Sequence, residues 1–262
     1  NDGVAAFDRE TADSSGKIAI TLQSGKTLTC DMAILAIGVR PEVKLAKEAG
    51  LEIGELGGIR VNEYLQTSDP HIYAIGDSIE VKHFVTGQYA LIPLAGPANR
   101  QGRLVADIIC GQKRTYEGTL GTSIAKVFDL AVAATGANEK TLKKLNIPYQ
   151  VSYTHPVSSA AYYPGGNKMS IKLIFSPEGQ VLGAQIVGTH GVDKRIDDIA
   201  GVIRRRGTVY DLQELELAYA PPFSSAKDPV NLAGYVAANI IEGKVEVIHW
   251  HDIAKLDPEN CV

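Results

Sequence analysis

Several patterns that define common protein classes are scarce or missing in this sequence. Only 3 of its 262 residues are cysteines and none forms a CxxC pair, which argues against a disulfide scaffold or zinc ribbon and for a reducing compartment, the cytoplasm. The longest apolar runs, such as MAILAIGV at 32–39, are too short to span a bilayer. A net charge of -4 provides no basic surface for nucleic acid. We therefore expect a soluble globular protein with no membrane and no nucleic acid among its partners.

The cysteines and histidines do not indicate a metal centre. Cys30, Cys110 and Cys261 are widely separated, and each is expected to be a small buried hydrophobic residue. His249 and His251 are two positions apart and would face one side of a strand, but no third ligand lies near them in the sequence. We therefore predict no metal site.

The first forty residues predict short strands. The alternating pattern of residues 1–31 includes a hairpin turn at Ser24 and Gly25. Residues 31–38, DMAILAIG, form a continuous apolar run of the kind that is buried on both faces of a parallel sheet. Such a strand needs neighbouring strands and crossover helices, yet no helical pattern precedes it. The chain is therefore expected to begin inside a domain.

Residues 41–112 predict short helices mixed with short strands. A short helix is expected within 41–51, and an apolar strand is expected near the end of TSDPHIYAIGD at 67–77. A longer helix is predicted over 93–111, because Pro97 suits its first turn. The face of this helix that is expected to pack consists of Ala98, Gly102, Val105 and Ile109.

From about residue 113 the sequence predicts a mostly antiparallel α+β unit. Asn138 is a suitable N-cap for a short helix, and SPEG at 176–179 is a turn between two strands. The predicted strands are two within 122–136 and one in each of 149–155, 170–175 and 180–188. The predicted helices are 138–145, 192–207 and 228–242.

Two local features at 76–102 allow more than one interpretation. Asp77 follows Gly76 at a predicted strand end, where open α/β sheets place ligand groups, but it is equally suited to capping a turn. The small residues Ala98 and Gly102 would let backbone N–H groups at a helix start approach an anionic ligand. The same small residues could instead permit close packing on a sheet.

Several ordered motifs resemble one family, the FAD-dependent pyridine nucleotide-disulfide oxidoreductases. TSDPHIYAIGD resembles the second flavin-binding motif of that family, AILAIGVRP at 33–41 resembles the exit from its NAD domain, and AGPANRQGR follows at a fitting distance. DKRID at 193–197 and LAYAPPFSSAKDPVN at 217–231 resemble its dimerisation domain. These last motifs are similar to the branch that contains coenzyme A-disulfide reductases, NADH oxidases and persulfide reductases.

The resemblance implies a fold class and four segments. It implies parts of doubly wound α/β domains for FAD and NAD(P), followed by an antiparallel-sheet dimerisation domain. The implied segments are 1–40 as the end of the NAD(P)-binding domain, 41–112 as the C-terminal part of the FAD-binding domain, 113–245 as the dimerisation domain, and 246–262 as a linker and the start of a rhodanese-like domain. The family's GxGxxG motifs and redox cysteine lie upstream of such segments, and this sequence has no GxGxxG.

The resemblance also implies cofactor contacts. It implies that Asp77, next to Gly76, accepts hydrogen bonds from the ribityl hydroxyls of FAD. The helix start at Leu94, Ala95 and Ala98 would direct backbone amides at the flavin and favour negative charge on the reduced ring. NAD(P)H is the implied reductant, and coenzyme A is implied as a substrate or bound ligand.

A departure from glutathione reductase narrows the implied chemistry. Residues 219–222 read Tyr-Ala-Pro-Pro, where that enzyme has a His-Pro pair, so a single reactive cysteine is implied in place of a pair. Tyr162 and Tyr219 match two tyrosines that coenzyme A-disulfide reductases take from the partner subunit. By pattern alone, Tyr162 and Tyr163 are instead loop-packing aromatics.

The implied protein is a homodimeric flavoenzyme that uses NAD(P)H to reduce coenzyme A disulfide or a low-molecular-weight persulfide. An NADH oxidase or peroxidase is the alternative within the same class. A dimerisation fragment without activity is the alternative outside it.

Overall fold

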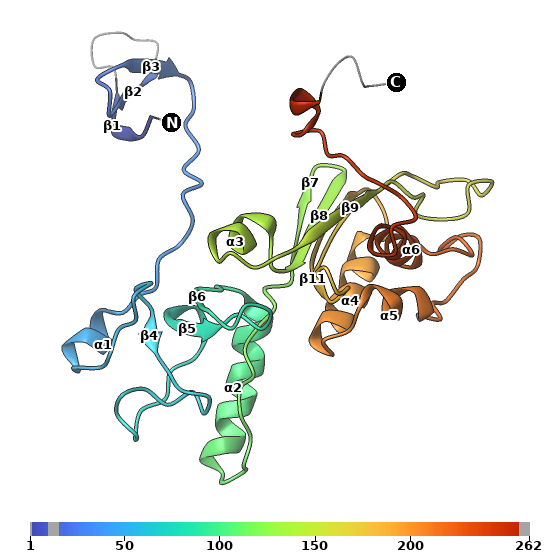
Figure 1. Ribbon diagram of the computed structural model, residues 1–262. Helices are drawn as coiled ribbons and strands as arrows, with labels where there is room; N and C mark the ends of the chain where they lie inside the picture. Colours follow the sequence, from blue (N-terminus) through green and yellow to red (C-terminus); the bar gives the residue numbers. More distant parts are fainter. Residues whose placement is uncertain (1, 10–15, 257–262) are drawn as a thin grey trace. The chain divides into compact units, whose positions relative to one another are not determined.

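The computed structural model describes residues 2–9 and 16–256 (Figure 1). The chain divides into two compact units, Asn1–Arg40 and Pro41–Val262. In the first unit, three antiparallel strands form a sheet in chain order: β1 (Val4–Arg9), β2 (Ile18–Leu22) and β3 (Thr27–Cys30). Gly25 has a φ of +83° in the turn between β2 and β3, which confirms the predicted hairpin.

Residues 31–38 do not form the predicted buried strand. They have no ladder partner among the described residues, and the side chains of Met32 and Ile37 are 71% and 88% exposed. An apolar run favours a strand, but a strand also needs hydrogen-bonding neighbours on the sheet. Without such neighbours in the described chain, the segment forms no strand.

The second unit begins with residues 41–112, which contain a small mixed sheet and two helices. The elements are α1 (Lys44–Glu48), β4 (Ile59–Arg60), the 3₁₀ turn η1 (Gly76–Ser78), β5 (Ile79–Lys82), β6 (Tyr89–Ala90) and α2 (Ala95–Ile109). Strand β5 pairs in parallel with β4 and antiparallel with β6. The core beneath this sheet includes Ala46, Ile59, Leu65, Ile79, Val81 and Leu104.

Two predictions in residues 41–112 are wrong in part. The apolar residues before Asp77 form only an isolated bridge between Gln66 and Tyr73, and the strand β5 follows Asp77 instead. Helix α2 forms where predicted, but it buries Gln101, Leu104 and Asp107, while Ile109 at the predicted face is exposed. Gln101 and Asp107 are buried because they have polar partners, which apolar periodicity does not reveal.

Residues 113–245 form a five-stranded antiparallel sheet with helices packed against it, as predicted. The elements are β7 (Ser123–Val127), β8 (Leu130–Gly136), α3 (Glu139–Lys144), β9 (Gln150–Thr154), β10 (Ser170–Phe175), β11 (Val181–Gly188), α4 (Val192–Arg204), α5 (Val209–Glu214) and α6 (Pro229–Ile241). The strand order is β7-β8-β11-β10-β9, and α4 and α6 contact this sheet (Figure 1). Its core joins Leu173, Phe175 and Ile186 of the strands to Ile196 and Ile199 of α4.

Local signals explain the two short helices of this region. The Asn138 side chain accepts a hydrogen bond from the Thr141 backbone N–H, which confirms its predicted role as the N-cap of α3. Helix α5 was not expected from the apolar pattern because it is short. It begins with a capping box in which Thr208 and Asp211 each accept a hydrogen bond from the other's backbone N–H. Thr208 and Asp211, three positions apart, are the sequence feature that could have predicted the start of α5.

One face of the five-stranded sheet exposes apolar side chains along β7, β8 and the end of β11, while α3 covers another part of this face. Alternation along β8 buries Ala133 under the helices and turns Val132 outward, where it pairs with Val187 of β11. Val127 and Leu130 pair with each other on the same side at the end of the β7–β8 hairpin. All four of these outward side chains are exposed.

Further sequence expectations concern the cysteines and the C-terminal segment. Cys110 is exposed and Cys30 is half-buried, so the expectation of fully buried cysteines is wrong for both, and Cys261 lies outside the described residues. Within the described ranges, no helix is long and apolar enough to cross a membrane, and no group of three or more potential ligands could hold a metal ion. The C-terminal segment has a short 3₁₀ turn, η2 (Ile253–Lys255).

Candidate functional site

The Gly76–Asp77 turn is attached to the second turn of α2. The Gly76 backbone N–H donates to Oε1 of Gln101 at 2.7 Å, and a side chain at Gly76 would contact Ala98. Gly76 has a φ of +79°, which only glycine adopts without strain. These contacts present Asp77 beside the start of α2.

The Asp77 carboxylate is available for a ligand. It is exposed, and it makes no hydrogen bond or ion pair within the described residues. The turn-capping interpretation is therefore wrong, because η1 has no side-chain cap. An exposed carboxylate at a rigid glycine turn can accept hydrogen bonds from hydroxyl groups.

The start of α2 is likewise available. Leu94 is its N-cap in extended conformation, no side chain caps it, and its first turn contains no acidic residue. Pro97 has no N–H, so the open donors are the backbone N–H groups of Ala95 and Gly96. Because the helix dipole adds partial positive charge, this end favours an electron-rich ligand. These groups fit a flavin. The carboxylate can accept hydrogen bonds from the ribityl hydroxyls, and the backbone amides can donate to an oxygen or nitrogen of the ring.

The two candidate tyrosines lie on two separate loops of residues 113–245. Tyr162 is on the loop between β9 and β10 and is 78% exposed, while Tyr219 is on the loop between α5 and α6 and is 48% exposed. Tyr163 is also exposed. The pattern-based interpretation of Tyr162 and Tyr163 as packing aromatics therefore does not hold.

The structure brings the Tyr162 and Tyr219 hydroxyls together. Their mutual hydrogen bond is the main cause that raises the pKa of Tyr219 above its ordinary value. The contact therefore favours the protonated hydroxyl of Tyr219. No hydrogen bond or ion pair within the described ranges joins this pair to the Gly76–Asp77 turn.

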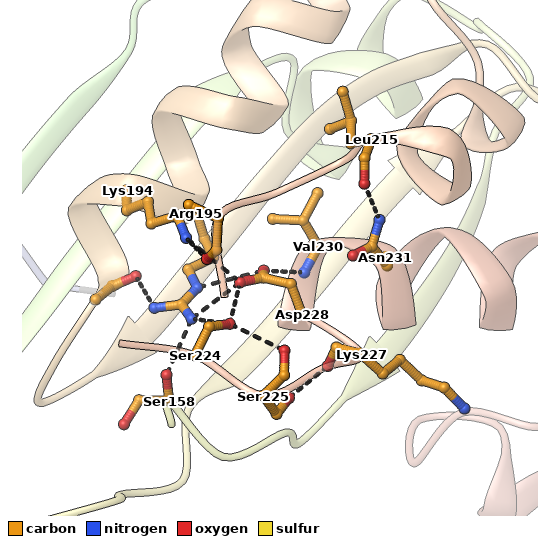
Figure 2. A network of polar contacts seen from close by, with 12 residues as sticks. Ser158, Lys194, Arg195, Leu215, Ser224, Ser225, Lys227, Asp228, Val230 and Asn231 are labelled. Carbon is orange, nitrogen blue, oxygen red and sulfur yellow. Dashed lines mark hydrogen bonds and ion pairs between the residues drawn. The ribbon is translucent and has the colours of Figure 1, made fainter. Parts of the chain in front are cut away.

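A buried charged network lies beneath the two tyrosine loops (Figure 2). Arg195 of α4 is 1% exposed, and its guanidinium donates to Oδ2 of Asp228 at 3.1 Å and to the Ser224 hydroxyl at 3.1 Å. It also donates to the carbonyl oxygens of Ser158 at 2.9 Å and Gly191 at 3.1 Å. A Cβ atom at Gly191 would lie 2.0 Å from Nη1 of Arg195, so glycine is needed there.

Asp228 is ionised within this network. Burial raises the pKa of its carboxyl, but hydrogen bonds from the Ser224 hydroxyl and the Val230 backbone N–H, together with the charge of Arg195, outweigh burial and hold the pKa below its ordinary value. The Val230 contact also makes Asp228 the N-cap of α6. One carboxylate therefore begins a helix and neutralises a buried arginine.

A second buried ion pair lies in residues 41–112. Glu80 is fully buried, and its Oε1 accepts backbone N–H groups of Leu56 at 2.7 Å and Gly58 at 3.3 Å. Its Oε2 lies 3.5 Å from Nη1 of Arg60, whose guanidinium stacks over the ring of Tyr89 at 3.9 Å. Neither Oε2 nor Nη1 makes a hydrogen bond within the described chain. This pair is less completely satisfied than the pair of Arg195 and Asp228.

Sequence reasoning did not identify Arg195, Asp228 or Glu80. Arg195 is in the DKRID motif and Asp228 is in the second dimerisation motif, but charged residues are ordinarily expected on a surface. The sequence feature that could have indicated a buried Arg195 is Gly191, four positions earlier. A glycine there leaves space for the arginine side chain.

Comparison with known proteins identifies the family. Residues 2–102 match the family described as pyridine nucleotide-disulphide oxidoreductase, and residues 122–229 match the dimerisation domain of that family. The chain belongs to the pyridine nucleotide-disulphide oxidoreductases. The predicted fold class of FAD/NAD-binding α/β domains with an antiparallel dimerisation domain is confirmed by these matches.

Individual relatives share most of this chain. The crystal structure of reduced CoADR-RHD from Bacillus anthracis is similar to this chain, with a TM-score of 0.90 and 57% sequence identity. The match covers 97% of this chain and 45% of that protein's chain. An NADH oxidase of Methanocaldococcus jannaschii is 38% identical over 87% of this chain and 51% of its own length. A CoA-dependent NAD(P)H sulfur oxidoreductase of Pyrococcus furiosus is 37% identical over 82% of this chain and 48% of its own. The chain spans about half the length of these relatives.

Proposed function

We propose that this chain supplies flavin contacts, a tyrosine pair and the dimer interface of an enzyme that reduces coenzyme A disulfide or a low-molecular-weight persulfide with NAD(P)H. The observation that carries the proposal is the hydrogen-bonded pair of Tyr162 and Tyr219 at the surface of the dimerisation domain. The relatives support it, because their names include CoADR-RHD and a CoA-dependent NAD(P)H sulfur oxidoreductase. We use "complete enzyme" for the protein of these relatives' length that carries this chain.

The residues near α2 would hold FAD. Asp77 would accept hydrogen bonds from ribityl hydroxyls, while Gly76 keeps the turn close to Ala98. Leu94 and Ala95 place the open N–H groups of the helix start where they favour negative charge on the ring. Bound FAD would supply the transfer of two electrons from NAD(P)H to a reactive cysteine.

The tyrosine pair would assist the sulfur chemistry. In the proposed reaction a cysteine thiolate of the complete enzyme attacks the substrate disulfide, forms a mixed disulfide and releases a thiolate. Each tyrosine carries one O–H, so the exposed pair can donate a hydrogen bond to a sulfur that carries negative charge. Both side chains are exposed, as a contact with a substrate or a second subunit requires.

The open sheet face supports a homodimer. Val132 and Val187 are paired exposed side chains on the face of the sheet opposite α4, and Val127 and Leu130 extend the apolar area. Such a face is suited to an isologous contact with a second copy of the chain. In that dimer each subunit's tyrosine pair would serve the flavin and cysteine of the other.

The relative from Methanocaldococcus jannaschii supports one alternative, an NADH oxidase. Oxygen would then take the place of the disulfide as the electron acceptor. The two functions differ in their need for a sulfur-directed donor, so the tyrosine pair discriminates between them.

Substitution of both tyrosines tests the proposal. In the complete enzyme, Tyr162→Phe with Tyr219→Phe should slow reduction of coenzyme A disulfide by about tenfold to a hundredfold, the effect of lost hydrogen bonds of about 1.5 to 3 kcal/mol. FAD content and oxygen-dependent NADH oxidation should stay near normal. Tyr163→Phe is the matched control and should have normal turnover. Unchanged disulfide reduction in the double variant would contradict the proposal.

A heterodimer tests whether the sites are shared between subunits. One subunit carries both tyrosine substitutions, and the other lacks the reactive cysteine. With shared sites, the first subunit keeps its cysteine and receives intact tyrosines, so one of two sites works and about half of wild-type turnover is expected. Near-zero turnover would show that the tyrosines serve their own subunit.

A further inference from the structure

The two tyrosines are held by their loops and not by their own packing. Tyr162 is 78% exposed and Tyr219 is 48% exposed, so few neighbouring atoms fix either ring. A hydrogen bond between two hydroxyls tolerates only a few tenths of an ångström of displacement before it weakens. The relative position of the two loops therefore decides whether the hydroxyls meet.

The loops are joined at their bases. The Ala160 backbone N–H, two positions before Tyr162, donates to the carbonyl of Pro221 at 3.2 Å, two positions after Tyr219. It is the one backbone hydrogen bond between these two loops within the described residues. This hydrogen bond fixes the distance between the loops at one point. Other contacts are needed to fix the orientation of one loop relative to the other.

Arg195 supplies those other contacts. Its Nη2 atom donates to the Ser158 carbonyl of the first loop at 2.9 Å, and to Ser224 and Asp228 of the second loop at 3.1 Å each (Figure 2). One planar guanidinium thus holds three points with a rigid geometry. Its neighbour Lys194 donates to the carbonyl of Ala218 at 3.4 Å.

We propose that Arg195, held by Asp228, is a positioning residue that fixes the two loops so that the hydroxyls of Tyr162 and Tyr219 meet. This inference rests on the proposed function for its effect on turnover. Its structural part concerns only this chain, because every residue that takes part lies within 158–228.

Turnover in two backgrounds tests the catalytic part. Arg195→Lys keeps a positive charge beside Asp228 but loses the planar group that reaches Ser158 and Ser224 together. In the complete enzyme it should lower kcat for coenzyme A disulfide by about tenfold or more, with KM for NAD(P)H unchanged. In the background with Tyr162→Phe and Tyr219→Phe it should cause no further loss.

The same fold loss in both backgrounds would overturn the proposal, because Arg195 would then act without the tyrosines. Normal turnover of Arg195→Lys in the wild-type background would overturn it too. Arg204→Lys is the matched control on the same helix, because Arg204 pairs with Glu117 near the surface. It should leave kcat unchanged in both backgrounds.

Titration of Tyr219 in this chain tests the structural part without any turnover. The tyrosine Cζ carbons are labelled with ¹³C, the Tyr219 signal is assigned by its loss in Tyr219→Phe, and its titration is followed by NMR. Arg195→Lys should lower the pKa of Tyr219, as Tyr162→Phe should, whereas Arg204→Lys should not. An unchanged titration in Arg195→Lys would overturn the positioning role. Normal turnover with both tyrosines substituted, beside a shifted titration, would overturn the proposed function but not the positioning.

Discussion

The two buried ion pairs of the second unit differ in how completely their charges are satisfied. Arg195 and Asp228 share hydrogen bonds with each other, with Ser224 and with backbone groups from both flanking loops. Glu80 and Arg60 are 3.5 Å apart, and one atom of each makes no hydrogen bond within the described residues. Burial of a charge costs several kcal/mol unless its partners compensate. The first pair is therefore part of a closed framework, whereas the second pair is only partly compensated.

This contrast extends to the regions around the pairs. Residues 113–245 enclose the pair of Arg195 and Asp228 in a unit of five strands and four helices. Residues 41–112 have a two-residue strand, an exposed Asp77 and an uncapped helix start. Residues 113–245 are therefore stabilised by their own internal contacts, whereas residues 41–112 leave polar groups available to a ligand.

Loss of the Asp228 charge should have the largest effect. Asp228→Asn leaves Arg195 buried without a counter-charge, which should lower the free energy of unfolding by about 3 to 5 kcal/mol. Urea denaturation of this chain measures it. Asp197→Asn, an exposed acid on α4, is the control and should change stability by less than about 0.5 kcal/mol. A loss under about 1 kcal/mol in Asp228→Asn would contradict the closed framework.

The same pair predicts a pH dependence. The pKa of Asp228 lies below its ordinary value of 3.8, so the stability that its charge contributes is complete above that value. It is lost as pH falls through the lowered pKa. The difference in unfolding free energy between the wild type and Asp228→Asn should be constant above about pH 5 and shrink below about pH 4. If the difference in unfolding free energy does not shrink in acid, the ionised carboxylate of Asp228 is not the source of the stability.

Truncation in the two cores sharpens the comparison. Leu173→Ala, in the fully buried core under α4, should cost about 2 to 5 kcal/mol. Leu104→Ala of α2 should cost less than half as much, because that core borders solvent and can relax. Both values come from urea denaturation of this chain. Equal losses would remove the contrast between the two regions.

Asp77 should matter for the ligand and not for folding. In the complete enzyme, Asp77→Ala should weaken FAD retention by about 1.5 to 3 kcal/mol, the contribution of a hydrogen bond to a charged group. The unfolding free energy without FAD should change by less than about 0.5 kcal/mol. Asp69→Ala in the preceding turn is the control for FAD affinity. Unchanged FAD affinity in Asp77→Ala would remove that residue from the site.

Glu80 should give the smallest effect. Glu80→Gln keeps an acceptor for the backbone N–H groups of Leu56 and Gly58 and removes only a charge that Arg60 partly compensates. A loss of about 1 to 2 kcal/mol is expected by urea denaturation. A loss as large as that of Asp228→Asn would show that both pairs are equally closed.

The sequence was most informative where structure depends on nearby residues. Periodicity and caps predicted the strands and larger helices of 113–245, and Asn138 caps α3 as expected. Residues 31–38 and 71–75 have strand-like patterns but no complete ladder, because pairing depends on a neighbouring strand that the pattern does not describe.

The candidate site shows the same limit. The family resemblance selected Tyr162 and Tyr219, which are 57 positions apart in the sequence, and their side chains interact in the structure. The arginine beneath them was not selected, because periodicity places charged residues outside. Only the contacts of Arg195 with two distant loops show that its charge belongs inside.

The order of strands in the five-stranded sheet has a kinetic consequence. Strands β7 and β8 form one local hairpin, and β10 and β11 form another. The central pairing of β8 with β11 joins Gly136 to Gly183 and Ala131 to Gly188. That step closes a loop of about fifty residues, which is slow compared with the closure of either hairpin. We therefore expect the two hairpins to form early in refolding. The pairing of β8 with β11 should be the slow step, and the helices can pack on the sheet only after it.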